Sequence, residues 1–145
     1  MLNTVLVALD GSDITERVIQ TLENLLLSSD SQIILCHVIP TSEEEPQKSA
    51  DVPQSNSSRV SYLQFEKQLQ AYQSRLLFKS ELEVVSGDPA EEIICLANIY
   101  KAELIVIGSR GLTGMKRIVK GSVSSQVMEE ANCSVLVVKP KIGDR

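Results

Sequence analysis

The chain has 145 residues, of which 43% are hydrophobic, and a net charge of −5; this length suits one domain that buries roughly two-thirds of its unfolded surface. Three Tyr, two Phe and no Trp leave the core to aliphatic residues, which favours buried parallel strands covered by helices. The acidic balance argues against a nucleic-acid face, which needs clustered Lys and Arg. No apolar run reaches the roughly 18 residues of a membrane span, and the first residues show no leader pattern. We expect a cytoplasmic protein that binds neither nucleic acid nor membrane.

The first elements form a strand–helix–strand pattern. The apolar run from Thr4 to Leu9 ends at the turn Asp10-Gly11-Ser12, as a buried strand does. Apolar residues at helical spacing predict a helix over 13–27, and a second buried strand is expected over 33–39. This pattern is typical of a parallel βαβ unit.

The composition then changes between Pro40 and Ser61, where three consecutive Glu residues, two prolines and a Ser/Asn run leave little to bury. We expect a mobile loop over 40–61, a helix over 62–78 and a strand over 82–85. The candidate core contacts of this helix are Leu63, Leu69, Tyr72, Leu76 and Leu77.

In the second half, Asp88 is expected to cap a helix that has Pro89 in its first turn and extends to about Tyr100. The remaining elements are a strand over 104–107, a glycine-rich segment over 108–121, a helix over 122–131 and a strand over 134–138. Five strands alternate with four helices. The pattern predicts an α/β fold with one domain over residues 1–145, built as an open, doubly wound five-stranded parallel sheet of Rossmann-like type.

The three cysteines, Cys36, Cys95 and Cys133, are far apart and have apolar neighbours. Without a Cys-x-x-Cys spacing they are interpreted as buried, reduced packing residues. A redox sensor is the alternative, but no nearby cation is placed to acidify a thiol.

Candidate binding residues gather at the carboxyl ends of the strands, where an open α/β sheet binds its ligands. The first strand delivers Asp10 to this edge, and the second delivers His37 and Val38. His37 is interpreted as a strand-end residue and not as a catalyst, because no nucleophile or orienting acid lies near it in a recognisable spacing.

The fourth strand delivers Gly108 and Gly111, followed after nine residues by Gly121 and Ser122. Glycine lets the backbone turn sharply and approach a ligand closely, and the start of a helix offers unpaired N–H groups to an anion. Taken singly, these residues could merely end a strand, loosen a loop and cap a helix. Their joint spacing, which is neither a Walker A pattern nor Gly-x-Gly-x-x-Gly, predicts a phosphate grip over 108–124.

With these motifs the sequence resembles the universal stress protein family over nearly its whole length. The glycine spacing is similar to that of the branch of the family that binds ATP, with its adenine nucleotide alpha hydrolase-like fold. The resemblance implies ATP or another adenine nucleotide as ligand, with Mg or Mn held mainly by the phosphates. It also implies a homodimer that pairs through the last strand, Val135–Val138, and a nucleotide-dependent switch in the stress response.

The resemblance implies an adenosine end and a phosphate end of the site. Asp10 would hold the ribose or the adenine side, and Val38 would meet the adenine edge through its main chain. Arg110 would reach the phosphates or lie along the surface. The implied nucleotide-binding residues are Ala8, Asp10, Val38, Ile107, Gly108, Arg110, Gly111, Gly121, Ser122, Val123 and Ser124.

Two other functions fit parts of the sequence. A slow ATP hydrolase would use the same site, although no general base or water-positioning Gln is evident beside the glycine segment; we therefore expect at most weak ATPase activity and assign no catalytic residue. A receiver domain that accepts a phosphoryl group shares the five-stranded sheet, but the acidic pair after its first strand is missing here.

Overall fold

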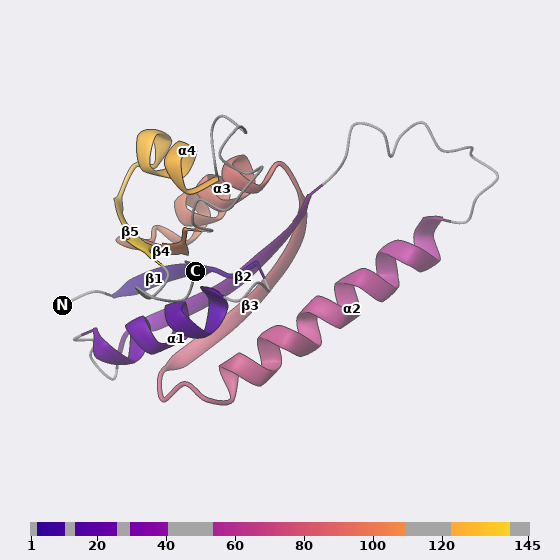
Figure 1. Cartoon of the computed structure of the whole chain (residues 1–145), viewed down its shortest axis with the longest axis horizontal. Helices are drawn as coiled ribbons and strands as arrows, with labels where there is room; N and C mark the ends of the chain where they lie inside the picture. The colour runs from indigo at the N-terminus through magenta and orange to yellow at the C-terminus, as the bar shows by residue number, and fades with distance from the viewer. Residues whose placement is uncertain (1–2, 11–13, 26–29, 41–53, 110–122, 140–145) are drawn as a thin grey trace.

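The computed structural model describes residues 3–10, 14–25, 30–40, 54–109 and 123–139, with backbone alone over 54–61. Within these ranges strands and helices alternate along the chain (Figure 1). The elements are β1 (Thr4–Ala8), α1 (Ile14–Asn24), β2 (Gln32–Pro40), α2 (Gln54–Gln73), β3 (Lys79–Gly87), α3 (Pro89–Tyr100), β4 (Leu104–Gly108), α4 (Val123–Glu130) and β5 (Ser134–Val138).

The five strands form one sheet in the order β3-β2-β1-β4-β5, and every neighbouring pair is parallel. The chain moves from β1 outward to β3, returns to the other side of β1 and continues to β5. The strand order therefore reverses between β1 and β4, which is where doubly wound sheets bind their ligands. The predicted fold class is confirmed. The order also differs from the 2-1-3-4-5 order of receiver domains, which excludes that alternative.

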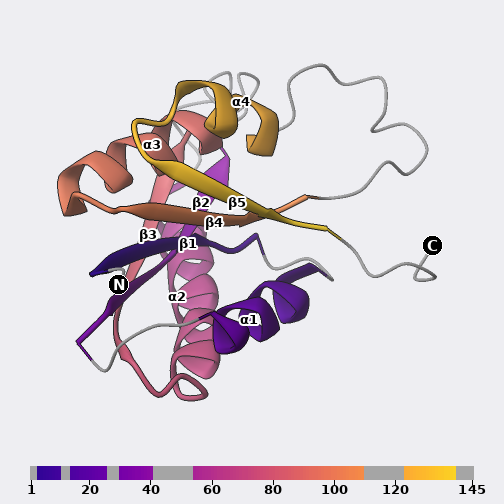
Figure 2. The same ribbon diagram turned by 90° about the vertical axis from the view of Figure 1, so that its left-hand side faces the viewer.

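Helices cover both faces of the sheet (Figures 1 and 2). On one face α1 and α2 bury alternate strand residues such as Val5, Val7 and Val106, together with Ile19 and Leu22 of α1. On the other face α3 and α4 cover a second cluster that contains Leu6, Ile34 and Ile105, with Ile93 and Val127 from the helices. Strands buried on both sides explain the continuous apolar runs of the sequence.

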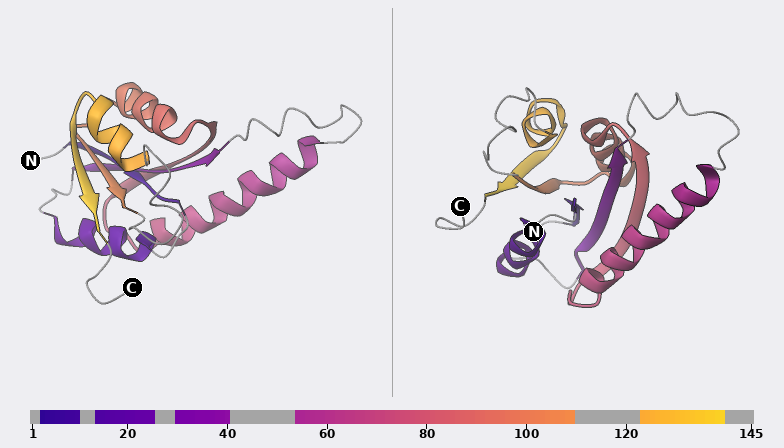
Figure 3. Two further views of the ribbon diagram at one scale, coloured as in Figure 1. Left: turned by 45° about the horizontal axis from the view of Figure 1, so that its top comes forward. Right: turned by 45° about the vertical axis from the view of Figure 1, so that its right-hand side comes forward.

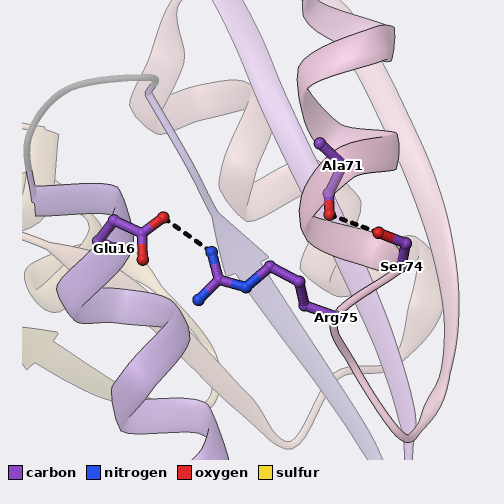
Figure 4. A network of polar contacts seen from close by, with 4 residues as sticks. All are labelled: Glu16, Ala71, Ser74 and Arg75. Carbon is purple, nitrogen blue, oxygen red and sulfur yellow. Dashed lines mark hydrogen bonds and ion pairs between the residues drawn. The ribbon is translucent and has the colours of Figure 1, made fainter.

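A polar contact joins the two helices of the first face. Arg75, just beyond the end of α2, donates to Glu16 of α1 at 2.8 Å (Figure 4), and its guanidinium lies 5.9 Å from the ring centroid of Tyr72. Ser74 caps the same turn by donating to the Ala71 carbonyl at 2.8 Å. The Arg75 contact lowers the pKa of Glu16, but both side chains are exposed, so the pair adds little to stability.

The α2 region departs from the sequence expectation. The helix begins at Gln54, inside the segment predicted as a loop over 40–61, and ends at Gln73, five residues before the predicted end at Phe78. The start was missed because few apolar residues mark this part of α2, which extends beyond the sheet in Figure 3. Of the predicted core contacts Leu69 is buried, whereas Leu63 and Leu77 are 52% and 97% exposed. Residues 41–53 lie outside the described residues.

The cysteine prediction is confirmed for one residue and wrong for another. Cys36 is fully buried in β2, whereas Cys95 is exposed and Cys133 is half-buried. Helix α3 packs on the sheet through Ala90, Ile93, Leu96 and Ala97, and Cys95 lies on its outer side. An apolar neighbourhood in sequence therefore did not mean burial.

The start of α3 agrees with the sequence analysis. Asp88 accepts the backbone N–H of Glu91 at 3.0 Å, and Pro89 occupies the first turn. Such a cap satisfies one of the free donors of a helix start. None of the helices in the described ranges has both the length and the apolar character required to cross a membrane.

Candidate functional site

The carboxyl ends of β1 and β4 lie side by side at the point of reversal. Ala8 is aligned with Cys36 on one side and with Ile107 on the other. Two further bonds prolong the pairing, since Leu9 N–H donates to the Cys36 carbonyl and Ser109 N–H donates to the Val138 carbonyl, both at 2.8 Å. The backbone on both sides of the point of reversal is thus held in register up to the edge.

Gly108 closes β4 at a place where no side chain fits. A Cβ atom there would lie 2.9 Å from both Cγ atoms of Ile14 and 3.2 Å from Val18. Both contacts belong to the first turns of α1. Glycine therefore lets the start of α1 approach the end of β4 closely, and a larger residue would force the Ile14 side chain or the helix to shift.

The predicted adenosine-end residues that the structure describes meet at this edge. Val38 and Ile107 are both buried, with 8% and 5% of their surface exposed. Asp10, two residues beyond the end of β1, is half-buried and makes interactions of its own. Ala8, aligned with Cys36 and Ile107, adds only a small side chain to this edge.

The phosphate end is only partly described. Val123 and Ser124 form the first turn of α4, with Val123 36% exposed and Ser124 half-buried and interacting. Arg110, Gly111, Gly121 and Ser122 lie outside the described residues, so their predicted roles remain predictions.

His37 is the residue of this edge that the list of predicted site residues left out. It is 6% exposed, its Nδ1 lies 2.7 Å from the Leu9 carbonyl oxygen, and its ring stacks on Phe65 with 3.8 Å between centroids. Burial lowers its pKa, while the Leu9 carbonyl and the charge of Asp10 oppose this shift. A position directly before Val38 is the one sequence signal that could have singled it out.

Other chemistry at this edge is limited. Burial raises the pKa of the Cys36 thiol to about 12, so this cysteine stays protonated and unreactive. In the part of the chain that the structure describes, no three His, Cys, Asp or Glu residues come together to hold a metal ion.

Comparison with known proteins assigns the family. The sequence model of the universal stress protein family matches residues 1–139. The chain belongs to the universal stress protein family. The universal stress protein YxiE of Bacillus subtilis is 29% identical over 151 aligned positions, which cover 96% of this chain and all of YxiE. The universal stress protein MJ0531 of Methanocaldococcus jannaschii is 49% identical over 61 residues, covering 42% of this chain and 36% of that protein.

Solved structures of the same family share the fold. The structure of MJ0577 from Methanocaldococcus jannaschii superposes with a TM-score of 0.79 at 28% identity and covers 96% of both chains. The five-stranded parallel sheet with four helices is therefore the universal stress protein fold.

Proposed function

We propose that this universal stress protein binds an adenine nucleotide at the carboxyl edge of β1 and β4. The observation that carries the proposal is the meeting of Ala8, Ile107 and Gly108 at the point where the strand order reverses. The side chains there are small or buried, so we expect an adenine at this edge to be recognised through main-chain groups. The adenosine would lie against Ala8, Asp10 and Val38.

The phosphates would extend from Gly108 toward the start of α4. Ser124 lies in the first turn of α4, where free N–H groups favour an anion. We place Arg110, Gly111, Gly121 and Ser122 along the phosphate chain by their position in the sequence, with any Mg or Mn held by phosphate oxygens. Nucleotide binding along this segment would change the surface that the protein shows to a partner.

Two solved structures of the same fold support an adenine nucleotide as the ligand to test. A universal stress protein in complex with cAMP superposes with a TM-score of 0.67 over 95% of this chain, and an Arabidopsis thaliana family protein with AMP bound superposes with 0.63 over 97%. The superpositions cover 97% of the cAMP-bound protein and 93% of the AMP-bound protein, and each protein is 23% identical to this chain. The nucleotide is a property of those proteins.

A thermal-shift experiment with ATP, AMP and GTP tests the proposal. A ligand at 100 times its Kd stabilises by about 2.7 kcal/mol, which raises Tm by about 5–10 °C in a chain of this size. We expect that shift with ATP or AMP, and its loss in the double variant Gly121→Val/Ser122→Leu. The control, Glu103→Ala at the opposite edge of the sheet, should shift as the wild type does. Equal shifts in the wild type and the double variant would place the nucleotide elsewhere, and no shift with any adenine nucleotide would refute the proposal.

The exposed edge of β5 supports a homodimer. The strand carries no charge, and the Val138 carbonyl accepts from Ser109 of β4. Because backbone groups alternate along a strand, the amides of Val135 and Val137 face away from β4, toward a second copy. An uncharged open edge of this kind favours pairing. Light scattering after size exclusion should show a dimer for the wild type and a folded monomer for Val137→Pro, which removes one outward donor. A monomeric wild type would contradict this pairing.

A further inference from the structure

His37 holds the chain in place just before Asp10. Beyond the last register pair of β1, Ala8 with Cys36, two contacts of Leu9 hold the chain against β2. Its N–H donates to the Cys36 carbonyl at 2.8 Å, and its carbonyl lies 2.7 Å from Nδ1 of His37. Leu9 is therefore fixed at both of its backbone groups by consecutive residues of one neighbouring strand.

The imidazole itself has little freedom. Phe65 of α2 stacks on it with an angle of 22° between the rings, and only 6% of the surface of His37 is exposed. A carbonyl oxygen only accepts, so the proton of the neutral ring is on Nδ1, which leaves Nε2 as an acceptor. Nε2 is buried and has no hydrogen-bond partner among the residues that the structure describes. Within the described part of the chain, the ring is held by one hydrogen bond, to the carbonyl of Leu9 just beyond β1, and by one aromatic stack.

We propose that His37 is a positioning residue for the adenosine end of the nucleotide site; this inference rests on the proposed function above. The ring touches Leu9 and Phe65, and through Leu9 it sets the direction in which the chain enters Asp10. The same residue precedes Val38, whose main chain forms the other side of the adenosine end. His37 of β2 thus contacts Phe65 of α2 and Leu9 beyond β1. It lies where the positions of Asp10 and of the Val38 main chain both depend on the backbone.

This arrangement predicts which part of the ligand responds. Loss of the Nδ1 proton donor releases the Leu9 carbonyl and shifts Asp10, whereas Gly108 and the start of α4 keep their positions. AMP and ATP should lose affinity by the same factor, because they share the adenosine and differ in the phosphate chain. One hydrogen bond near the upper end of the usual net range corresponds to about a tenfold change in Kd.

Isothermal titration of ATP and AMP into the full chain tests the inference through His37→Asn and His37→Leu. The Asn Nδ2 can donate from nearly the position of the imidazole Nδ1, whereas Leu keeps the bulk and removes the donor. We expect His37→Asn to bind within about threefold of the wild type and His37→Leu to bind about tenfold more weakly to both nucleotides. His37→Gln, whose amide lies nearer the Nε2 position, should resemble His37→Leu and decides the matter if His37→Leu does not fold.

A double-mutant cycle with Asp10→Ala separates positioning from general damage. If His37 acts through Asp10, His37→Leu should cost less than about threefold once Asp10 is already Ala, because interacting sites are not additive. Circular dichroism at the assay temperature checks that each variant is folded, and Glu103→Ala should bind as the wild type does.

The outcomes are distinguishable. Full additivity in the cycle, wild-type affinity in His37→Leu, or equal losses in His37→Asn and His37→Leu would overturn the positioning role while leaving nucleotide binding intact. A wild-type chain that binds no adenine nucleotide overturns both the proposed function and this inference.

Discussion

The two ends of the parallel sheet treat their polar groups differently. At the amino ends the groups pair with one another on the surface: Asn3 N–H donates to Glu103 at 2.6 Å, Glu103 N–H donates to the Thr4 carbonyl at 2.9 Å, and Gln32 donates to Glu81 at 2.6 Å. At the carboxyl ends His37 is buried with its Nε2 unpaired among the described residues, and at Gly108 a Cβ would press on Ile14. At the amino edge the described polar groups pair with one another, whereas the carboxyl edge combines a buried imidazole with a glycine that lets α1 pack closely.

The largest loss of stability should follow from adding a side chain at Gly108. In Gly108→Ala the new Cβ would meet Ile14 at 2.9 Å, and overpacking of this kind costs about 1–3 kcal/mol. Urea denaturation followed by circular dichroism measures the change. The double variant Gly108→Ala/Ile14→Ala should cost less than the sum of the single variants, because the second substitution removes both clashing atoms. A Gly108→Ala chain within about 0.5 kcal/mol of the wild type would show that this edge tolerates a side chain.

The next effect concerns pH. Burial lowers the pKa of His37 below its usual 6.5, so between the folded pKa and 6.5 the unfolded chain binds the proton more readily. The contribution of this residue to stability is complete above about pH 6.5 and is lost as the pH falls below it, with a slope of at most about 1.4 kcal/mol per pH unit for one proton.

His37→Asn supplies the control for that pH dependence, since the wild type and the variant share the same carboxylates and differ only in the imidazole. The free energy of unfolding, measured at pH 7.5, 6.5 and 5.5, should fall more steeply in the wild type than in His37→Asn. Parallel curves, or a wild type that gains stability relative to the variant on acidification, would be inconsistent with a neutral buried imidazole.

The smallest effect is expected at the amino edge. Glu103→Ala removes the acceptor of the Asn3 N–H, but the contact is exposed and water can replace it, so we expect a loss of about 0–1 kcal/mol. The same urea experiment measures it. A loss as large as that of Gly108→Ala would erase the contrast between the two edges.

Much of the fold followed from local patterns in the sequence. The strand ends near Asp10 and Gly108 were predictable because each apolar run stops at a turn residue, and Asp88 with Pro89 marked the start of α3. The start of α2 at Gln54 had no such signal, since Ser and Asn residues dominate its first turns. The prediction for β3 was too short. Charged and other side chains alternate in its first residues, at an edge of the sheet, so these residues do not form the apolar run that marks a buried strand.

The candidate site was predictable only in part, for a different reason. The glycine spacing and Asp10 are visible along the chain. The role of His37 depends on Leu9 and Phe65, each 28 residues away in sequence, and the stack arises only when α2 crosses back over β2. Cys95 could not be told from Cys36 by its neighbours, because the side of α3 that meets the sheet is settled by packing.

Nitrogen-15 chemical-shift mapping during an ATP titration tests nucleotide binding at the carboxyl edge most directly, because it reports on both edges in one experiment. We predict saturable shifts of the amides at Ala8 to Asp10, Val38, Gly108 and Ser124, with Asn3, Gln32, Glu103 and Ser134 at the amino edge unchanged. Shifts confined to the amino edge, or no saturable shift with millimolar ATP or AMP, would contradict the account.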